Sequence, residues 1–373
     1  MIQKLTISNF KIHDHTEIVF APVTLLTGMN GMGKSSVIQS LLLLRQSYRK
    51  SQLSYGLNLI GDLCSVGTSS DVECQYSNSD LLKLGLQFDS KIVDFEFEYP
   101  SKQNLTFLPR INKTRDFLRK NALFNRNCQY LSANRFGPQQ VYSRNTWLVQ
   151  AENQVSEING RCEYAVHYLL ENKRNHVLSD LAYSNETGQD LTLEKQVQLW
   201  LSEISPNISV EIEESGSELK LKYNYKYPNT FSSQAIPATN TGFGISFALP
   251  ILVAILGARK GALIFIENPE AHLHPLGVIA LTKLFAKAVK AGIQIVVETH
   301  SDRVVAGMLE AVNSKQISSS DLSLYLFESE TNRHVSVATK IGIQPSGFLQ
   351  PNSPKAFYDI IDLNYLSSQL PNP

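Results

Sequence analysis

The residues best suited to chemistry in this sequence form a glycine-rich stretch near its start, TGMNGMGKSS. It fits the pattern G-x-x-x-x-G-K-[ST] through Gly28, Gly33, Lys34 and Ser35. An apolar, strand-like segment precedes it and a segment with helical apolar spacing follows, which is the context that the pattern requires. Glycines let backbone N–H groups approach phosphate oxygens, while lysine and hydroxyl side chains reach outer phosphates and magnesium. The residues expected to contact the nucleotide are Asn30, Gly31, Gly33, Lys34, Ser35 and Ser36.

A second feature is the stretch LIFIENPEAHLHP, from Leu263 to Pro275. Its apolar residues predict a buried strand ending at Glu267, and a carboxylate at such a strand end can hold magnesium, usually through water. The alternative is that Glu267 caps the next helix. Asn268 follows where fast hydrolysis would need a second acid, and its amide can orient a water but cannot take its proton. Hydrolysis is therefore expected to be slow unless another base, such as Glu270, is supplied.

Histidines follow two of the predicted strands. His300, in IQIVVETHSD, lies where ligands bind in an open parallel sheet, so it could sense a terminal phosphate; a structural histidine is the alternative. His272 and His274 precede a proline at spacing i, i+2, which favours a role in the turn or in a subunit contact over metal binding. The candidate catalytic residues are Lys34, Glu267, Asn268 and His300, and the candidate Mg²⁺ ligands are Ser35 and Glu267.

The order of predicted elements indicates an α/β fold. Short alternating segments between about residues 53 and 99 predict antiparallel strands, and ISVEIEES with ELKLKYNYKY predicts a hairpin. After the hairpin, helical patterns alternate with the strands ALIFIE, IQIVVET and LSLYLFES, which favours a mainly parallel sheet covered by helices. The expected parts are a core segment with the phosphate loop and a β layer (1–104), an inserted helical lobe (105–205), a second core segment (206–330) and a C-terminal extension (331–373).

Composition narrows the class of protein. Lys plus Arg and Asp plus Glu both number 34, so overall charge does not favour nucleic acid or an anionic membrane as a partner. The four cysteines are scattered without C-x-x-C spacing, which disfavours a thiolate metal site. Apolar runs fall short of the roughly 18 residues of a membrane span. The expectation is a cytoplasmic protein without a membrane segment.

The phosphate loop, the acid strand and ETHSD, in this order, resemble the ABC-type ATPase heads of the RecF, SMC and OLD (overcoming lysogenization defect) groups. The likeness covers roughly residues 1–60 and 235–330. Through ENPEAHLHP and GFGIS it is similar to bacterial ATPases that include or neighbour those of anti-phage systems such as Septu. The positions that the resemblance implies are Lys34 and Ser35 for ATP and magnesium, Glu267 for Walker B, Asn268 for the usual catalytic glutamate and His300 for the switch histidine.

The resemblance also gives a meaning to TNTGFGISFALP. In ABC-type proteins a signature loop that opens a helix binds the terminal phosphate held by the opposite subunit, and Gly242, Gly244 and Ser246 resemble that loop. The segment departs from the usual L-S-G-G-[QE], and an ordinary turn before an apolar helix is the alternative.

The segment YLSANRFGPQQVY is a weaker match to a Q-loop. Gln139 or Gln140 could reach magnesium, and Arg135 could reach phosphate or signal movement of the lobe. The sequence favours surface or hinge positions for all three residues over these roles.

Possible partners follow from two further segments. The region from Arg110 to Arg126 holds six basic residues and one acid, Asp116, which fits either a solvated helix face or contact with a nucleic-acid backbone. OLD-type nucleases carry a nuclease domain after the ATPase, but here the last segment offers only Asp359 and Asp362, with no histidine beside them. Any destructive activity is therefore expected in a partner chain.

The leading hypothesis is an ABC-type ATPase that dimerises around Mg-ATP, hydrolyses it slowly, and controls a separate effector, a nuclease or toxin, in anti-phage defence. One alternative is a non-hydrolysing scaffold that holds ATP and orders an assembly around a toxin or nuclease. The other is a DNA-repair ATPase of RecF type.

Overall fold

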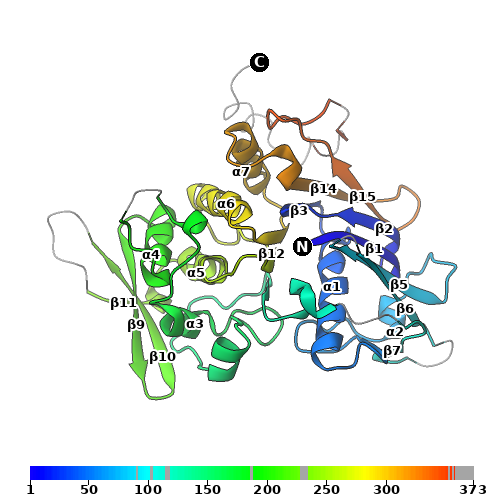
Figure 1. Cartoon of the computed structure of the whole chain (residues 1–373), viewed down its shortest axis with the longest axis horizontal. Helices are drawn as coiled ribbons and strands as arrows, with labels where there is room; N and C mark the ends of the chain where they lie inside the picture. The colour runs from blue at the N-terminus through cyan, green and yellow to red at the C-terminus, as the bar shows by residue number, and fades with distance from the viewer. Residues whose placement is uncertain are drawn as a thin grey trace. The chain divides into compact units, whose positions relative to one another are not determined.

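The computed structural model describes residues 1–89, 91–100, 104–113, 118–184, 188–226, 234–351, 353–354 and 357. The chain forms two compact units (Figure 1). Unit 1 comprises Met1–Cys128, Val296–His300 and Ser318–Pro373, and unit 2 comprises Gln129–Ile295 and Ser301–Ile317. The segment that contains ETHSD is thus divided between the units, with its first residues in unit 1.

Unit 1 contains an antiparallel β layer of strand order β2-β1-β5-β6. Its strands are β1 (Ile2–Phe10), β2 (His13–Val19), β5 (Leu81–Phe88) and β6 (Lys91–Glu98). Buried side chains alternate with more exposed ones along β5, as expected for a sheet with one covered face. A smaller antiparallel pair, β4 (Gly56–Asn58) with β7 (Phe107–Pro109), and the short helix α2 (Ser69–Val72) accompany it. The strands expected between residues 53 and 99 are therefore present.

The core sheet of six strands has the order β15-β14-β3-β13-β12-β8. Its members are β3 (Val23–Gly28), β8 (Cys128–Leu131), β12 (Leu263–Glu267), β13 (Gln294–Glu298), β14 (Leu322–Ser329) and β15 (Ser336–Ile341). β14 pairs with β3 in parallel, and β15 is an antiparallel edge strand. Helix α1 (Lys34–Arg49) follows β3 and buries a row of leucines. The predicted α/β fold with a mainly parallel core sheet is confirmed.

Helices make up most of unit 2. They are α3 (Ala165–Asn172), α4 (Leu193–Ile204), α5 (Phe243–Leu256), α6 (Pro275–Lys290) and α7 (Asp302–Asn313), besides a π-helical turn at Trp147–Ala151. Helix α5 is apolar on nearly all sides, and α3 and α4 pack against it, while α6 packs against α7. Among the described residues, no helix has the length and apolarity needed to cross a bilayer.

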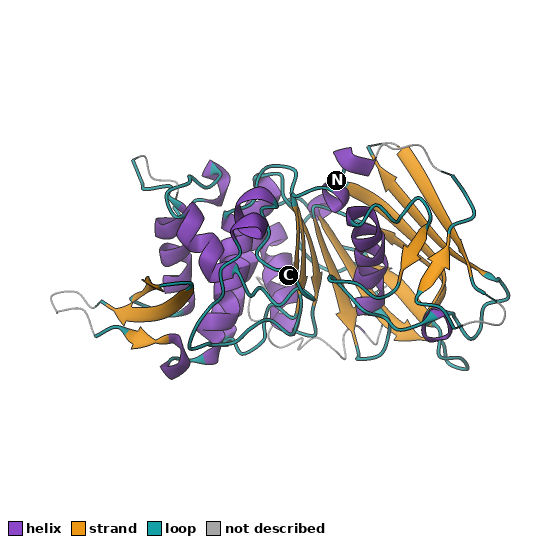
Figure 2. Ribbon diagram, turned by 90° about the horizontal axis from the view of Figure 1, so that it is seen from below, coloured by secondary structure: helices purple, strands orange, loops and turns teal. Residues whose placement is uncertain are grey.

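A three-stranded sheet of order β11-β10-β9 completes unit 2. β9 (Ile208–Ser215) and β10 (Glu218–Tyr225) form the predicted hairpin, and the two-residue strand β11 (Ile236–Pro237) adds to β10. Gly216 in the turn has φ 59°, a conformation that favours glycine. The sheet forms an orange layer beside purple helices in Figure 2, in agreement with contacts of β9 with α4 and of β10 with α3.

Candidate nucleotide-binding site

The phosphate loop (residues 28–35) connects the fully buried strand β3 to the start of α1, as the sequence predicts. Gly28, Gly31 and Gly33 have φ values of 130°, 78° and 94°, which side-chain-bearing residues rarely adopt. A Cβ on Gly28 would also lie 2.3 Å from the carbonyl oxygen of Phe327. At Gly31 nothing lies within 4 Å, so only the backbone conformation demands glycine there. The loop therefore has the tight backbone that phosphate binding requires.

Two side chains that were not among the predicted site residues form hydrogen bonds with backbone carbonyls of the phosphate loop. His13 Nε2 lies 3.1 Å from the Gly33 carbonyl oxygen, and its Nδ1 lies 2.8 Å from Thr16 Oγ1. Because a carbonyl only accepts, Nε2 carries the hydrogen and Nδ1 accepts from the threonine. Burial lowers the pKa of His13 to about 4, with a smaller opposing effect of the bond to Gly33. Ser336 Oγ donates to the Met32 carbonyl oxygen at 2.7 Å.

Lys34 is buried beneath the loop, where its Nζ donates to the carbonyl oxygens of Gly28 at 2.8 Å and Met29 at 2.6 Å. Burial lowers the pKa of this lysine, and attraction to the carboxylate of Glu298 partly offsets that shift. Asn30 and Gly31 form the exposed tip of the loop, whereas Ser36 is buried in the first turn of α1.

The end of β13 lies against the phosphate loop within unit 1. Ser35 Oγ donates to Glu298 Oε1 at 2.7 Å, and the N–H of Thr299 donates to the Leu26 carbonyl oxygen at 3.1 Å. His300 is exposed, and its Nδ1 lies 3.0 Å from the Gly28 carbonyl oxygen, to which it donates. The structure therefore brings His300 to the loop, and it adds Glu298, which was not among the predicted site residues.

Within unit 2, the acid turn (residues 267–275) begins at the end of β12. Both carboxylate oxygens of Glu267 are hydrogen-bonded, Oε1 by Tyr130 Oη at 3.0 Å and Oε2 by the N–H of Ala133 at 3.0 Å. Burial raises the pKa of Glu267, although these two bonds and nearby Arg135 act in the opposite direction. Glu267 does not serve as the N-cap of α6, because His274 does so by accepting from the N–H of Leu276.

Arg135 is buried among backbone carbonyls of the same unit. Its Nη1 donates to Ser132 O and Glu267 O, both at 2.6 Å, and its Nη2 donates to Asn268 O at 2.9 Å. Asn268 has φ 43°, a left-handed conformation that asparagine tolerates better than most residues. The guanidinium thus fixes the backbone of the acid turn, a role that differs from the phosphate contact or lobe signal expected from the sequence.

The remaining part of the acid turn packs against α5. The His272 ring lies 5.8 Å from the Phe243 ring and 4.6 Å from the Phe247 ring, centroid to centroid. His272 and His274 thus contribute to the turn, as the sequence favoured. No group of three or more His, Cys, Asp or Glu side chains suited to a metal occurs in the part of the chain that the structure describes.

The signature-like residues lie at the start of α5. Gly242 is its exposed N-cap, and a Cβ on Gly244 would lie 2.5 Å from the His272 carbonyl oxygen. Ser246 is buried one turn into the helix, with 4% of its surface exposed. The exposed donors at this helix start are therefore backbone groups near Gly242, and the role of all three residues in phosphate binding stays a prediction.

The weaker candidates have local partners. The N–H of Gln139 donates to Tyr142 Oη at 3.1 Å, and its side-chain amide reaches the Gly137 carbonyl oxygen at 3.4 Å. Arg110 donates to the Leu53 carbonyl oxygen and stacks on Phe95, so it supports the fold. Among the other basic residues, Lys113, Arg119, Lys120 and Arg126 are exposed. Arg115, Asp116, Asp359 and Asp362 lie outside the described residues.

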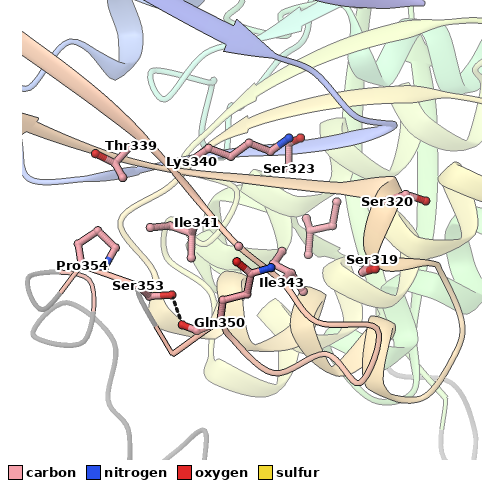
Figure 3. A pocket seen from close by; sticks show the side chains of 12 residues that line it. Ser319, Ser320, Ser323, Thr339, Lys340, Ile341, Ile343, Gln350, Ser353 and Pro354 are labelled. Atoms are coloured by element: carbon pink, nitrogen blue, oxygen red, sulfur yellow. Dashed lines mark hydrogen bonds between the residues drawn. The ribbon is translucent and has the colours of Figure 1, made fainter.

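A pocket of about 540 Å³ in unit 1 does not involve the predicted site residues. It lies between the start of β14, the end of β15 and the loop that follows (Figure 3). Its polar lining includes Lys340, Ser323 and Gln350, and Ser353 Oγ donates to the Gln350 carbonyl oxygen at 2.7 Å. The phosphate loop lines no part of this pocket, so it is not the nucleotide site.

Comparison with known families supports the interpretation of the phosphate loop. The sequence matches the family described as AAA ATPase domain over residues 1–159 and 150–305, which together are more than half of the chain. No curated protein sequence matches the chain significantly.

Among solved structures, SMC head domains are similar to this chain. An SMC head bound to the C-winged helix domain of ScpA is 14% identical, with a TM-score of 0.53, over 92% of this chain and 98% of that one. The SMC head domain from Thermotoga maritima is 11% identical, with a TM-score of 0.47, over 92% and 99%. An SMC head from Pyrococcus furiosus bound to the C-terminal domain of ScpA is 14% identical, with a TM-score of 0.49, over 91% and 96%. At 14% identity, the first of these structures shows a similar fold and nothing further.

Proposed function

Because the chain belongs to the family of AAA ATPase domains, we propose that it binds ATP with Mg²⁺ at the phosphate loop and hydrolyses it slowly. The observation that carries this proposal is the conformation of residues 28–35. Three glycines with positive φ occur from the last residue of a buried strand to the N-cap of a 16-residue helix, and Lys34 lies directly beneath them. N–H groups at a helix start favour anions, and an ammonium group held at the loop by two backbone carbonyls is within the loop that would surround the phosphates.

The oxygen donors fit magnesium better than a softer metal. Ser35 offers a hydroxyl at the start of α1, and Glu267 offers the carboxylate that the family pattern assigns to the ion. Mg²⁺ prefers oxygen ligands and completes its shell with nucleotide oxygens and water, so it needs no dedicated cluster of protein ligands. When bound, the ion would neutralise charge that develops on the phosphates.

Slow hydrolysis follows from the residue after Glu267. Asn268 Oδ1 is shielded from solvent and has no hydrogen-bond partner among the described residues. A shielded acceptor of this kind would be satisfied by a water that donates to it. The amide can orient such a water, but it cannot take the proton that attack on a phosphate releases.

His300 is assigned to sensing the terminal phosphate. Its Nδ1–H donates to the Gly28 carbonyl oxygen, which holds the ring against the phosphate loop. A negatively charged phosphate near the ring would favour its doubly protonated form. The bond to Gly28 would then link the presence of that phosphate to the conformation of the phosphate loop.

We further infer that two copies associate head to tail around ATP. In support, Gly242 exposes the start of α5, and Phe243 beside it is 59% exposed. A helix start of this kind suits the phosphate of a nucleotide held by a second copy. Under this proposal, the residues that meet the second copy's nucleotide are Gly242, Gly244 and Ser246.

The output of the ATP-bound dimer is proposed to be control of a separate effector, a nuclease or toxin, in anti-phage defence. The exposed residues Arg119, Lys120 and Arg126 offer positive charge for a nucleic-acid backbone. The second candidate function, an ATP-held scaffold without turnover, is favoured by Asn268 in place of an acid. A DNA-repair ATPase of RecF type is the third.

The test compares wild type with Lys34→Ala, Asn268→Ala and the control Lys83→Ala, which removes a lysine from an exposed ion pair with Glu96. We expect Lys34→Ala to weaken binding of a fluorescent ATP analogue, while Lys83→Ala binds as wild type does. Single-turnover phosphate release and ATP-dependent dimerisation, measured by light scattering, then separate the two leading functions. Dimerisation without phosphate release, with or without an effector, would favour the scaffold. Unchanged ATP binding by Lys34→Ala would refute the nucleotide site itself.

A further inference from the structure

We propose that Glu298, the first residue of ETHSD, is an acid of the magnesium site, supplied by the unit that carries the phosphate loop. The inference rests on the proposed binding of Mg-ATP and adds a residue to that site. It starts from one contact, the 2.7 Å hydrogen bond from Ser35 Oγ to Glu298 Oε1.

The backbone fixes Glu298 at this place. It is the last residue of β13, a strand whose side chains are all buried, and the next N–H, that of Thr299, donates to Leu26 of β3. β3 continues directly into the phosphate loop. Glu298 and Ser35 are therefore held by two ordered segments of unit 1, although 263 residues separate them in the sequence.

The hydrogen bond is compatible with metal binding at Ser35. A serine hydroxyl has one hydrogen and two lone pairs, so Ser35 can donate to the carboxylate and still present its oxygen to a cation. The bond also fixes the rotation of the hydroxyl, and partners that orient a ligand in this way tune metal affinity. Glu298 thus orients Ser35 and adds negative charge beside it.

Burial and charge favour the same role. Glu298 is only 6% exposed, and Lys34, which interacts electrostatically with it, is 2% exposed. Hydrogen bonds and nearby cations stabilise a buried carboxylate. Lys34 supplies one positive charge, and in an ATP-binding loop that charge also acts on the phosphates. A divalent cation next to Ser35 would add positive charge beside the carboxylate when the nucleotide is bound.

Glu298 and Glu267 differ in the partners of their carboxylates. The carboxylate of Glu267 is bonded at both oxygens by groups of its own unit, Tyr130 Oη and the Ala133 N–H. Glu298 is bonded to the side chain that the phosphate-loop pattern assigns to magnesium. Glu298 is therefore the acid that unit 1 itself brings to the magnesium-binding hydroxyl.

The experiment uses Glu298→Gln, which keeps the size of the side chain and an acceptor for Ser35 while it removes the charge. Glu17→Gln is the matched control, because Glu17 is an exposed acid of unit 1 that pairs with Lys4. Binding of a fluorescent ATP analogue is measured in EDTA and over a range of Mg²⁺ concentrations. Affinity for Mn²⁺ in the presence of the analogue is measured by electron paramagnetic resonance.

We expect Glu298→Gln to bind the analogue in EDTA at least as well as wild type, since a negative charge near the phosphates is gone. Its Mn²⁺ affinity, and the gain in nucleotide affinity from Mg²⁺, should fall by about tenfold or more. Glu17→Gln should behave as wild type. Glu298→Asp, which keeps the charge, should recover part of the metal dependence and provides the measurement if the glutamine variant does not fold.

Two kinds of failure are distinguishable. If wild type binds no nucleotide under any condition, the proposed function is wrong. If wild type binds with a clear Mg²⁺ dependence, and a folded Glu298→Gln retains the same dependence and the same Mn²⁺ affinity, only the role of Glu298 is overturned.

Discussion

Replacement of His13 tests whether this buried histidine supports the phosphate loop in its neutral form. Its pKa is lowered to about 4 by burial, against an ordinary value of 6.5. Above the ordinary value, both folded and unfolded chains hold a neutral ring, so pH has no effect through this residue. As pH falls below 6.5, the unfolded chain gains a proton that the folded chain does not, and stability is lost until the folded ring titrates near 4.

The size of the effect follows from the two pKa values. Each pH unit between them removes about 1.4 kcal/mol of stability, so the loss between neutral pH and about pH 5 is roughly 2 kcal/mol. His13→Gln removes the titrating group, while its amide can still donate to the Gly33 carbonyl. We therefore expect the stability of wild type relative to this variant to fall by roughly 2 kcal/mol over that pH range.

The assay is urea unfolding of wild type and His13→Gln at about pH 7.5 and about pH 5. At each pH, the free energy of unfolding of the variant is subtracted from that of wild type, which removes the contributions of the other histidines that both proteins share. His15→Gln is the control, because His15 lies on the same strand but is exposed. Because His15→Gln still contains His13, its free energy of unfolding should fall between the two pH values as that of wild type does. A wild type minus His13→Gln difference that stays constant between the two pH values would refute the assignment of a neutral, buried His13.

Three further substitutions test the framework of the site. Gly28→Ala should lower the melting temperature and abolish ATP binding, because its Cβ would lie 2.3 Å from Phe327 O at φ 130°; normal binding would contradict this. Arg135→Met should destabilise the protein by about 3 kcal/mol or more in denaturant titrations, since it leaves buried carbonyls unpaired; Arg135→Lys should recover part of the loss. Tyr130→Phe should remove about 1 kcal/mol of stability. It should also raise the pKa of Glu267 further, which shifts the acid limb of single-turnover hydrolysis to higher pH; an unshifted limb would argue against this bond.

The sequence was most informative where one residue pattern determines one local structure. The stretch from Gly28 to Ser35 predicted the phosphate loop, because the glycines and the following helix that such a loop requires are close together in the sequence. The apolar runs ending at Glu267 and before His300 predicted buried strands, and both strands are present. The hairpin of β9 and β10 also followed from alternation and a glycine turn.

The sequence was least informative where a role depends on a distant neighbour. Glu298 stands in the quoted motif ETHSD, yet only the folded chain shows that it meets Ser35. His13 lies in a strand with no distinctive pattern, and its function depends on the position of Gly33. Arg135 was interpreted as a surface or hinge residue, or as one that could reach phosphate or signal movement of the lobe, whereas the side chain is 3% exposed. Its actual partners are carbonyl oxygens of a turn that no sequence pattern places beside it.

The parallel pairing of β14 with β3 has a consequence for synthesis of the protein. The phosphate loop leaves the ribosome long before Phe327 and Ser336, which contact Gly28 and Met32. The serine is 304 residues away from its partner in the chain. Contacts of such long sequence separation form late in folding. A nascent or prematurely terminated chain would thus carry the phosphate-loop residues without the strands that contact them, and we expect it to bind ATP only after β14 and β15 have been synthesised.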